Sequence, residues 1–415
     1  MKSLKNTLTL ALSLALCACS SEVVKPNDNQ AHQHSSEQEK KALCKQSNQA
    51  PSISCADTVT AQFAPDGQLW IAWVNGEHIY LQTSADQGAH YSDPIKVNQN
   101  PESIAAHGEY RPKLKFDAQG NLYLTWTQNL EKRHTGNIRF SRSLDGGKTF
   151  SQAITINDNL DIIGHRFDDL AIGKNGEIFI AWLDSRDKEV AKANKQNFLG
   201  TAVYYTWSND GGVSFKPNQP VAPHSCECCR LGIAIDNDNL PVVLWRHVFE
   251  GQIRDQALIK FTRWDKPGNL QRVSQENWNI EACPHHGPAL SIAEDGRYHA
   301  VWFSGAADKQ GLFYGYSNNQ GNSFSTPVKF GNQGAKHPNV FAHANQVSIV
   351  WSEFDGKQNL LQAMHSKDNG LTWSTAHTIA STPESADDGF LVSNGEQLYV
   401  SWQTGGGYQF SQLSD

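Results

Sequence analysis

Two short segments concentrate the chemically reactive side chains of this sequence. Residues 225–230 read Ser-Cys-Glu-Cys-Cys-Arg, and residues 282–287 read Ala-Cys-Pro-His-His-Gly. Thiolates and imidazoles together favour soft or borderline ions, chiefly Cu(I) and Zn(II), over Ca(II) or Mg(II). The predicted metal ligands are the cysteines and histidines of both segments and one later histidine: Cys226, Cys228, Cys229, Cys283, His285, His286 and His337.

The same four cysteines have a second interpretation. In an oxidising compartment they can form two disulfides that tie neighbouring parts of the fold together. Adjacent Cys228 and Cys229 can pair with each other only through a strained ring, which argues against a simple staple. The nearby histidines favour the metal interpretation, because disulfides need no imidazoles. For Cys44 and Cys55 a structural disulfide is predicted.

The N-terminal residues predict the compartment. An apolar run at 8–16 follows two lysines and is too short to span a bilayer, which is typical of a signal peptide. The run ends in Leu-Cys-Ala-Cys, which resembles the lipobox of bacterial lipoproteins and implies lipidation of Cys19, with ordinary secretion as the alternative. We therefore expect a signal peptide at 1–18 and a flexible, lipid-anchored tether at 19–43. Ser20, where no Asp stands, implies the outer membrane of a bacterial envelope, with the protein facing the periplasm.

One repeat organises the rest of the chain. A hydrophobic strand, a Gly or Asn turn and a second strand ending in Trp recur every 49 to 63 residues, for example as FAPDGQLWIAW and FDAQGNLYLTW. This spacing fits four short strands with their turns, and no helical period accompanies it. We expect the rings to wedge between neighbouring sheets as core residues. The seven tryptophans are Trp73, Trp126, Trp182, Trp245, Trp302, Trp351 and Trp402.

A second motif falls between the tryptophan strands. Five segments share the pattern Ser-x-Asp/Asn-x-Gly-x-x-aromatic. They begin at Ser84, Ser143, Ser208, Ser317 and Ser366. These segments resemble the Asp-box, or BNR repeat, of sialidase-like β-propellers, and the resemblance covers about residues 44–415. In such a turn the Asp or Asn side chain caps backbone N–H groups, glycine takes a positive φ and the aromatic ring pins the turn to the sheet.

The expected fold is all-β, a single seven-bladed β-propeller at 44–415. Six blades are the alternative, because sialidases proper have six. After Trp402 only one further strand fits, so the seventh unit lacks its outermost strand. We expect an N-terminal strand at 50–54 to complete that sheet and close the ring. Because a propeller grows by adding blades, 415 residues do not require several domains.

Composition and charge narrow the function classes. With 39% hydrophobic and 19% charged residues, the chain is too apolar to be disordered. A formal net charge of −7 argues against a nucleic-acid binder, which normally carries a basic stripe. The expected partners are the membrane, through the N-terminal lipid, and a metal ion or an envelope protein. The protein is expected to be a monomer.

Propeller geometry places the candidate residues on one face. Ligands of propellers normally bind where the loops leading into each first strand converge on the axis. Cys226 and Cys283 lie at equivalent positions of the fourth and fifth units, so the predicted metal site lies on this face. Arg111, Arg166 and Arg230 lie in corresponding loops and form an alternative, anion-binding set, because guanidinium forks bind carboxylates well.

The sialidase resemblance implies an alternative function, an exo-glycosidase that acts on an acidic sugar with Asp57 or Asp168 as the acid. The sequence departs from the sialidase pattern, because Tyr-Arg-Pro at 110–112 follows the first Asp-box and lacks Ile. Salt bridges from the arginines to residues such as Glu109 would make them purely structural. A third interpretation is a non-catalytic interaction scaffold, with the charged loop 184–198 as a docking element. The catalytic residues are therefore unknown, and a soft-metal site is the favoured function.

Overall fold

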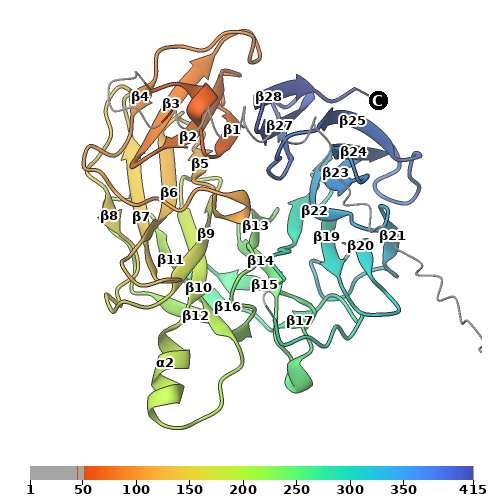
Figure 1. The fold of residues 1–415 in the computed structure, drawn as a ribbon. Coiled ribbons are helices and arrows are strands. Elements are labelled where there is room, and N and C mark those ends of the chain that lie inside the picture. Colours follow the sequence, from red (N-terminus) through yellow and green to blue (C-terminus); the bar gives the residue numbers. More distant parts are fainter. Residues whose placement is uncertain (1–43, 45–50, 283, 415) are drawn as a thin grey trace, which may run out of the picture.

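The computed structural model describes residues 44, 51–282 and 284–414. Seven antiparallel sheets surround a central axis, and Figure 1 shows them as a ring of blades. Seven blades are present, as the sequence predicts, and the six-bladed alternative is wrong. The expected signal peptide, tether and lipidated Cys19 lie outside the described residues. Within the described part of the chain, no helix is both long enough and apolar enough to cross a membrane.

The blades follow one another along the chain. Blade 1 comprises β1 (Val59–Phe63), β2 (Leu69–Asn75), β3 (His78–Ser84) and β4 (Ile95–Lys96). Blade 2 comprises β5 (Lys113–Phe116), β6 (Leu122–Asn129), β7 (Gly136–Ser143) and β8 (Ile154–Thr155). Blade 3 comprises β9 (His165–Ile172), β10 (Ile178–Asp184), β11 (Thr201–Ser208) and β12 (Gln219–Ser225). Blade 4 comprises β13 (Gly232–Ile235), β14 (Pro241–Arg246), β15 (Gln256–Arg263), β16 (Lys266–Pro267) and β17 (Gln271–Arg272).

The remaining blades have the same order of strands. Blade 5 comprises β18 (Ala289–Ile292), β19 (Tyr298–Ser304), β20 (Gly311–Ser317) and β21 (Val328–Phe330). Blade 6 comprises β22 (Lys336–His343), β23 (Gln346–Phe354), β24 (Asn359–Ser366) and β25 (His377–Thr382). Blade 7 comprises β26 (Phe390–Ser393), β27 (Leu398–Thr404) and β28 (Gly407–Gln412). Short helices in the connections are η1 (Ile53–Cys55), η2 (Gly108–Tyr110), α2 (Arg186–Ala193) and η3 (Glu250–Gln252).

The seven predicted tryptophans all lie in the second strand of a blade, and each is at most 1% exposed. Trp126 of β6 shows their role, because its cluster contains Val74 and Leu81 of blade 1 together with Leu124 of blade 2. These second strands are covered on both faces, so they are apolar almost throughout. Burial of such large rings between sheets stabilises the contact between neighbouring blades.

The Asp-box turns also join neighbouring blades. In blade 2, the Ser143 hydroxyl donates to Asp145 and accepts the Gly147 N–H at 2.9 Å, while Asp145 accepts the Thr149 N–H at 3.0 Å. Gly147 has a φ of +79°, and a Cβ there would lie 2.5 Å from the Trp70 ring of blade 1. The glycine therefore meets two requirements, a positive φ and close approach to the preceding blade.

The ring closes without the strand that the sequence predicts. Blade 7 has three strands, and Ile53–Cys55 form the 3₁₀ helix η1, so the described residues of the predicted strand at 50–54 do not extend the sheet. The Ser52 hydroxyl accepts a backbone N–H two residues on, a local bond that competes with strand pairing. Instead β1 packs against β26 and β27, with the Phe63 and Tyr399 rings 5.2 Å apart.

Loop 184–198 contains the helix α2, which the sequence analysis does not predict. Asp187 and Glu189 lie in its first turn, where carboxylates offset the helix dipole. Tyr204 of β11 donates to Asp187 at 2.9 Å and ties the helix to blade 3. A helix of eight residues is too short to show a clear hydrophobic period, so pattern analysis misses it.

Gly146 and Gly147 offer a matched test of the contact between blades. Both have a positive φ, of +70° and +79°, but a Cβ would meet nothing within 4 Å at Gly146 and would strike Trp70 at Gly147. We expect Gly146→Ala to lower the free energy of unfolding by about 1–2 kcal/mol. Gly147→Ala should lower the free energy of unfolding by about 1–3 kcal/mol more than Gly146→Ala, because its Cβ overpacks the contact with Trp70. Urea unfolding followed by tryptophan fluorescence measures both, and equal losses would contradict this role of the contact.

Candidate functional site

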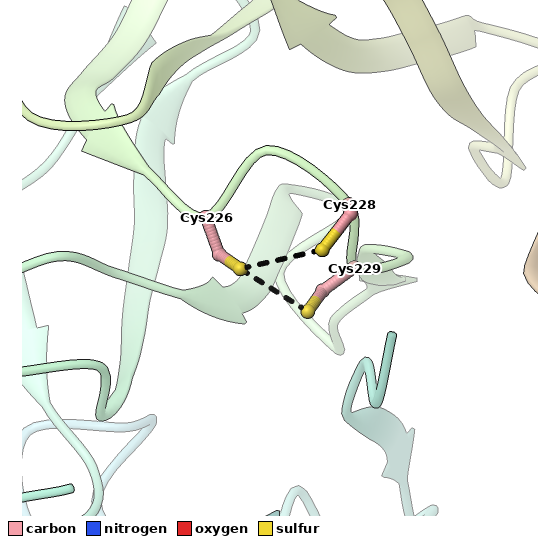
Figure 2. A group of neighbouring side chains, drawn as sticks. All are labelled: Cys226, Cys228 and Cys229. Atoms are coloured by element: carbon pink, nitrogen blue, oxygen red, sulfur yellow. Dashed lines mark hydrogen bonds between the residues drawn. The ribbon is translucent and has the colours of Figure 1, made fainter. Parts of the chain in front are cut away.

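Three of the predicted thiol ligands lie together in the loop after β12. The Sγ atom of Cys226 lies 3.4 Å from that of Cys229 and 3.9 Å from that of Cys228, as Figure 2 shows. A disulfide needs about 2.05 Å between sulfurs, so these three are not bonded to one another. All three are buried, at no more than 3% exposure. Cys283, the fourth predicted thiol, lies outside the described residues.

Two arginines reach the sulfur cluster. Arg254 Nη1 lies 3.3 Å from Cys226 Sγ, and the charge of Arg246 also acts on this thiol. Hydrogen bonds from the Cys228 and Cys229 thiols, together with these charges, hold the pKa of Cys226 well below its ordinary value despite burial. Burial and the neighbouring Cys226 raise the pKa of Cys229 well above its ordinary value. The cluster therefore favours the thiolate form of Cys226 and the neutral form of Cys229.

Backbone contacts fix the cysteine loop in place. The Cys226 N–H donates to the Arg246 carbonyl at 2.9 Å, and Ser225 forms an isolated bridge with His247. Gly200 of the adjoining loop passes so close to the Ser225 carbonyl that any larger residue there would clash. The loop is thus held against β14 and against the segment leading into β11.

The predicted imidazole ligands do not join the sulfurs. Among the described residues, the sulfurs share no group with an imidazole in which all ligand atoms lie within 4.8 Å of one another. His337 instead forms a second group with Glu109 and Asp388, and its Nδ1 atom lies 3.5 Å from an oxygen of each carboxylate. The His286 ring lies 4.7 Å from that of His337, and His285 lines a cavity at the propeller axis that is described below. The structure thus divides the predicted set into a sulfur group and an oxygen–nitrogen group.

Glu109, in the helix η2, connects the loops that carry both groups. Its carboxylate accepts the N–H of Arg230 at 2.7 Å and the N–H of Gly287 at 2.6 Å. Burial opposes its ionisation, but the His337 imidazole and the Arg230 charge outweigh burial and lower the pKa of Glu109 to about 2. A residue of blade 2 therefore holds the cysteine loop of blade 4 and the histidine loop of blade 5.

The arginines of the alternative anion site are largely engaged inside the protein. Arg111 and Arg230 are buried and paired with carboxylates. The pairs are Arg111 with Asp387 at 2.8 Å, Arg230 with Glu109 at 3.4 Å and Arg230 with Asp388 at 3.4 Å. Arg166 lies over the Tyr110 ring, 4.8 Å from its centroid. A substrate carboxylate would have to displace these internal partners from Arg111 and Arg230, which favours the structural interpretation of these two residues.

A cavity of about 1270 Å³ opens at the axis. Its ionisable lining consists of carboxylates and imidazoles with one lysine among the described residues. These groups are Asp57, Glu77, His78, His107, Glu109, His285, Lys336, His337, Asp387 and Asp388. Burial lowers the pKa of His107, so its imidazole is neutral at neutral pH. Carboxylates outnumber the lysine in this lining, and three of them pair with Arg111 or Arg230 behind it.

The cavity adjoins both cysteine features of the chain. Tyr110 and Phe167 line it and also belong to the hydrophobic cluster that contains the three thiols. A disulfide joins Cys44 to Cys55, whose Cα atoms lie 5.5 Å apart, and both residues line the cavity. This is the pairing that the sequence analysis expects.

Comparison with known proteins supports the fold. No protein-family model and no curated protein matches the chain. Among the solved structures that match, a protein of unknown function from Dyadobacter fermentans is 16% identical, with 77% of this chain and 96% of that chain covered and a TM-score of 0.51. An ulvan lyase from a new family of polysaccharide lyases is 12% identical, with 88% of this chain and 92% of that chain covered and a TM-score of 0.51. An α-L-arabinanase from Penicillium chrysogenum is 14% identical, with 77% of this chain and 97% of that chain covered and a TM-score of 0.51. At these identities the likeness establishes the β-propeller fold alone.

Glu109 should make the stability of the metal-free protein depend on pH in the acid range. Its pKa falls from 4.5 to about 2 on folding, so its stabilisation is complete above 4.5 and is lost as the pH falls towards 2. Between pH 4.5 and pH 2 we expect the free energy of unfolding to fall by about 3 kcal/mol more in the wild type than in Glu109→Gln, which has no carboxylate to titrate at this position. Urea unfolding at a series of pH values measures the difference, with exposed Glu131→Gln as the control. Equally steep losses in wild type and Glu109→Gln would refute this role.

Proposed function

We propose that this protein binds a soft metal ion, Cu(I) or Zn(II), at the buried thiols of Cys226, Cys228 and Cys229. The spacing of the sulfurs supports this most directly. Four bonds of about 2.3 Å around a tetrahedral zinc ion set neighbouring sulfurs about 3.8 Å apart. The separations of 3.4 and 3.9 Å from Cys226 Sγ lie on either side of this value. An ion therefore needs only small side-chain movements to bind.

The charges around the sulfurs also suit a metal ion. Thiolates are the ligand form of cysteine, and the Cys226 thiol already ionises more readily than usual. Three thiolates around one Cu(I) leave two negative charges in excess in a buried place. Arg246 and Arg254 supply two positive charges there, and buried charge needs such compensation.

The wider ligand set remains part of the proposal. Cys283, which precedes Gly287 by four residues in the chain, is the proposed fourth thiolate. His285 and His286 follow it after Pro284 and act as imidazole ligands or as neighbours that guide the ion. Such a site stores, senses or delivers copper or zinc.

The cellular setting is proposed from the sequence alone. Lipidated Cys19 and the tether hold the propeller at the outer membrane, where it faces the periplasm as a monomer and exchanges metal with an envelope partner. An exo-glycosidase for acidic sugars has weaker support, because Arg111 and Arg230 already bind carboxylates and the cavity is rich in carboxylates. No observation specifically favours a pure interaction scaffold.

Metal analysis combined with thiol titration tests the proposal on protein purified from the periplasm. We expect about one equivalent of copper or zinc in the sulfur cluster, because thiolate sites bind these ions strongly. A Cys226→Ser/Cys229→Ser variant should lose it, whereas Cys44→Ser/Cys55→Ser, which also removes two cysteines, should keep it. A metal-free protein whose cysteines are all oxidised would leave only the disulfide interpretation.

A further inference from the structure

The group of Glu109, His337 and Asp388 is not explained by a site made of sulfur. All three line the axial cavity, and the two carboxylates are buried. His337 is largely buried as well, with 15% of its side chain exposed. Glu109 and Asp388 lie in the connections that lead into β5 and β26, and His337 lies near the start of β22. The ring therefore brings two carboxylates and one imidazole together at the edge of a solvent-accessible space.

We propose that these three residues form a second metal site, which binds a divalent transition-metal ion through oxygen and nitrogen. A tetrahedral zinc ion with bonds of about 2.0–2.1 Å to such ligands separates them by about 3.4 Å. His337 Nδ1 lies 3.5 Å from Glu109 Oε1 and 3.5 Å from Asp388 Oδ2. Two edges of the coordination polyhedron are thus present, and the cavity leaves room for water at the remaining position.

A buried nitrogen atom supports the same conclusion. Nδ1 of His337 has no hydrogen-bond partner among the described residues. Hydrogen bonds of this kind span about 2.7–3.2 Å, so contacts of 3.5 Å satisfy the His337 nitrogen poorly. A buried polar atom without a partner is costly, and a metal ion between the three ligand atoms removes that cost for His337.

The backbone at His337 is shaped to aim its side chain. The pairing of β22 with β23 shifts register between Lys336 and Asn339, which is a β-bulge. His337 has a φ of +52°, in the left-handed region that residues with a side chain seldom adopt. Bulges redirect side chains, and strained backbone of this kind concentrates at functional sites. His285, which also lines the cavity, likewise has a φ of +52°.

One guanidinium group lies beside both carboxylates of the proposed site. Arg230 Nη1 lies 3.4 Å from both carboxylates and neutralises one of them. The carbonyl oxygens of Pro288 and Pro338 also accept from this guanidinium, so it is held in place beside the site. Two carboxylates and an imidazole favour borderline divalent ions such as Zn²⁺, Co²⁺ or Mn²⁺, in contrast to the sulfur cluster.

Titration with Co²⁺ distinguishes the two sites. Cobalt bound by thiolates shows sulfur-to-metal charge-transfer absorption in the near ultraviolet, which cobalt bound by oxygen and nitrogen lacks. We expect the reduced, chelator-treated full chain to bind one Co²⁺ with this band and one without it. His337→Gln and the isosteric Asp388→Asn should each weaken Co²⁺ binding at the site without the band by roughly tenfold or more. Both variants should keep the charge-transfer band.

The controls make each outcome decisive. His343→Gln removes an exposed histidine that also contacts a carboxylate, Glu294 at 3.1 Å, and should bind both ions like wild type. Thermal unfolding establishes that every variant is folded. The second site is disproved if no Co²⁺ binds without the charge-transfer band. It is also disproved if that Co²⁺ binds to His337→Gln and Asp388→Asn as tightly as to the wild type. Loss of the charge-transfer band alone would count against the sulfur site and leave this inference standing.

Discussion

The buried carboxylate of Glu109 is the contact on which both candidate sites depend. It accepts the N–H groups of Arg230 and Gly287, which directly follow Cys229 and His286 in the chain. One side chain from blade 2 thereby positions the cysteine loop of blade 4 and the histidine loop of blade 5. Because an ionised carboxylate in the interior needs every one of its partners, these loops cannot move independently.

The axis of the propeller thus holds two environments of different chemical softness. The sulfurs lie among apolar side chains and are approached by Arg246 and Arg254. The oxygen and nitrogen groups face a cavity open to solvent, and Arg230 stands beside them. Tyr110 and Phe167 contact both environments. A ring of rigid blades, each fixed by its tryptophan, can keep such different groups close together without mixing them.

The blades are predictable from sequence because each repeat encodes its own strands and its contact with the next blade. Trp126 and Gly147 show this, since both act on a neighbouring sheet from a fixed place in the repeat. The cysteine cluster is predictable in part, because three of its members lie within four residues. Asp388 reaches its site from the connection before blade 7, Arg254 reaches the sulfurs from the connection between β14 and β15, and no local spacing marks either residue. His337 likewise lies at a register shift in β22, which no local sequence pattern marks.

The Cys44–Cys55 disulfide spans only 11 residues, and both of its cysteines precede the sulfur cluster by a long stretch of chain. A short loop closes at a low entropic cost. In a chain that is exported N-terminus first, as we propose, this pair can form before Cys226 emerges. Cys44 and Cys55 are then already paired when the cluster cysteines emerge from the export channel. Few free thiols therefore remain that could exchange with Cys226, Cys228 or Cys229 during folding.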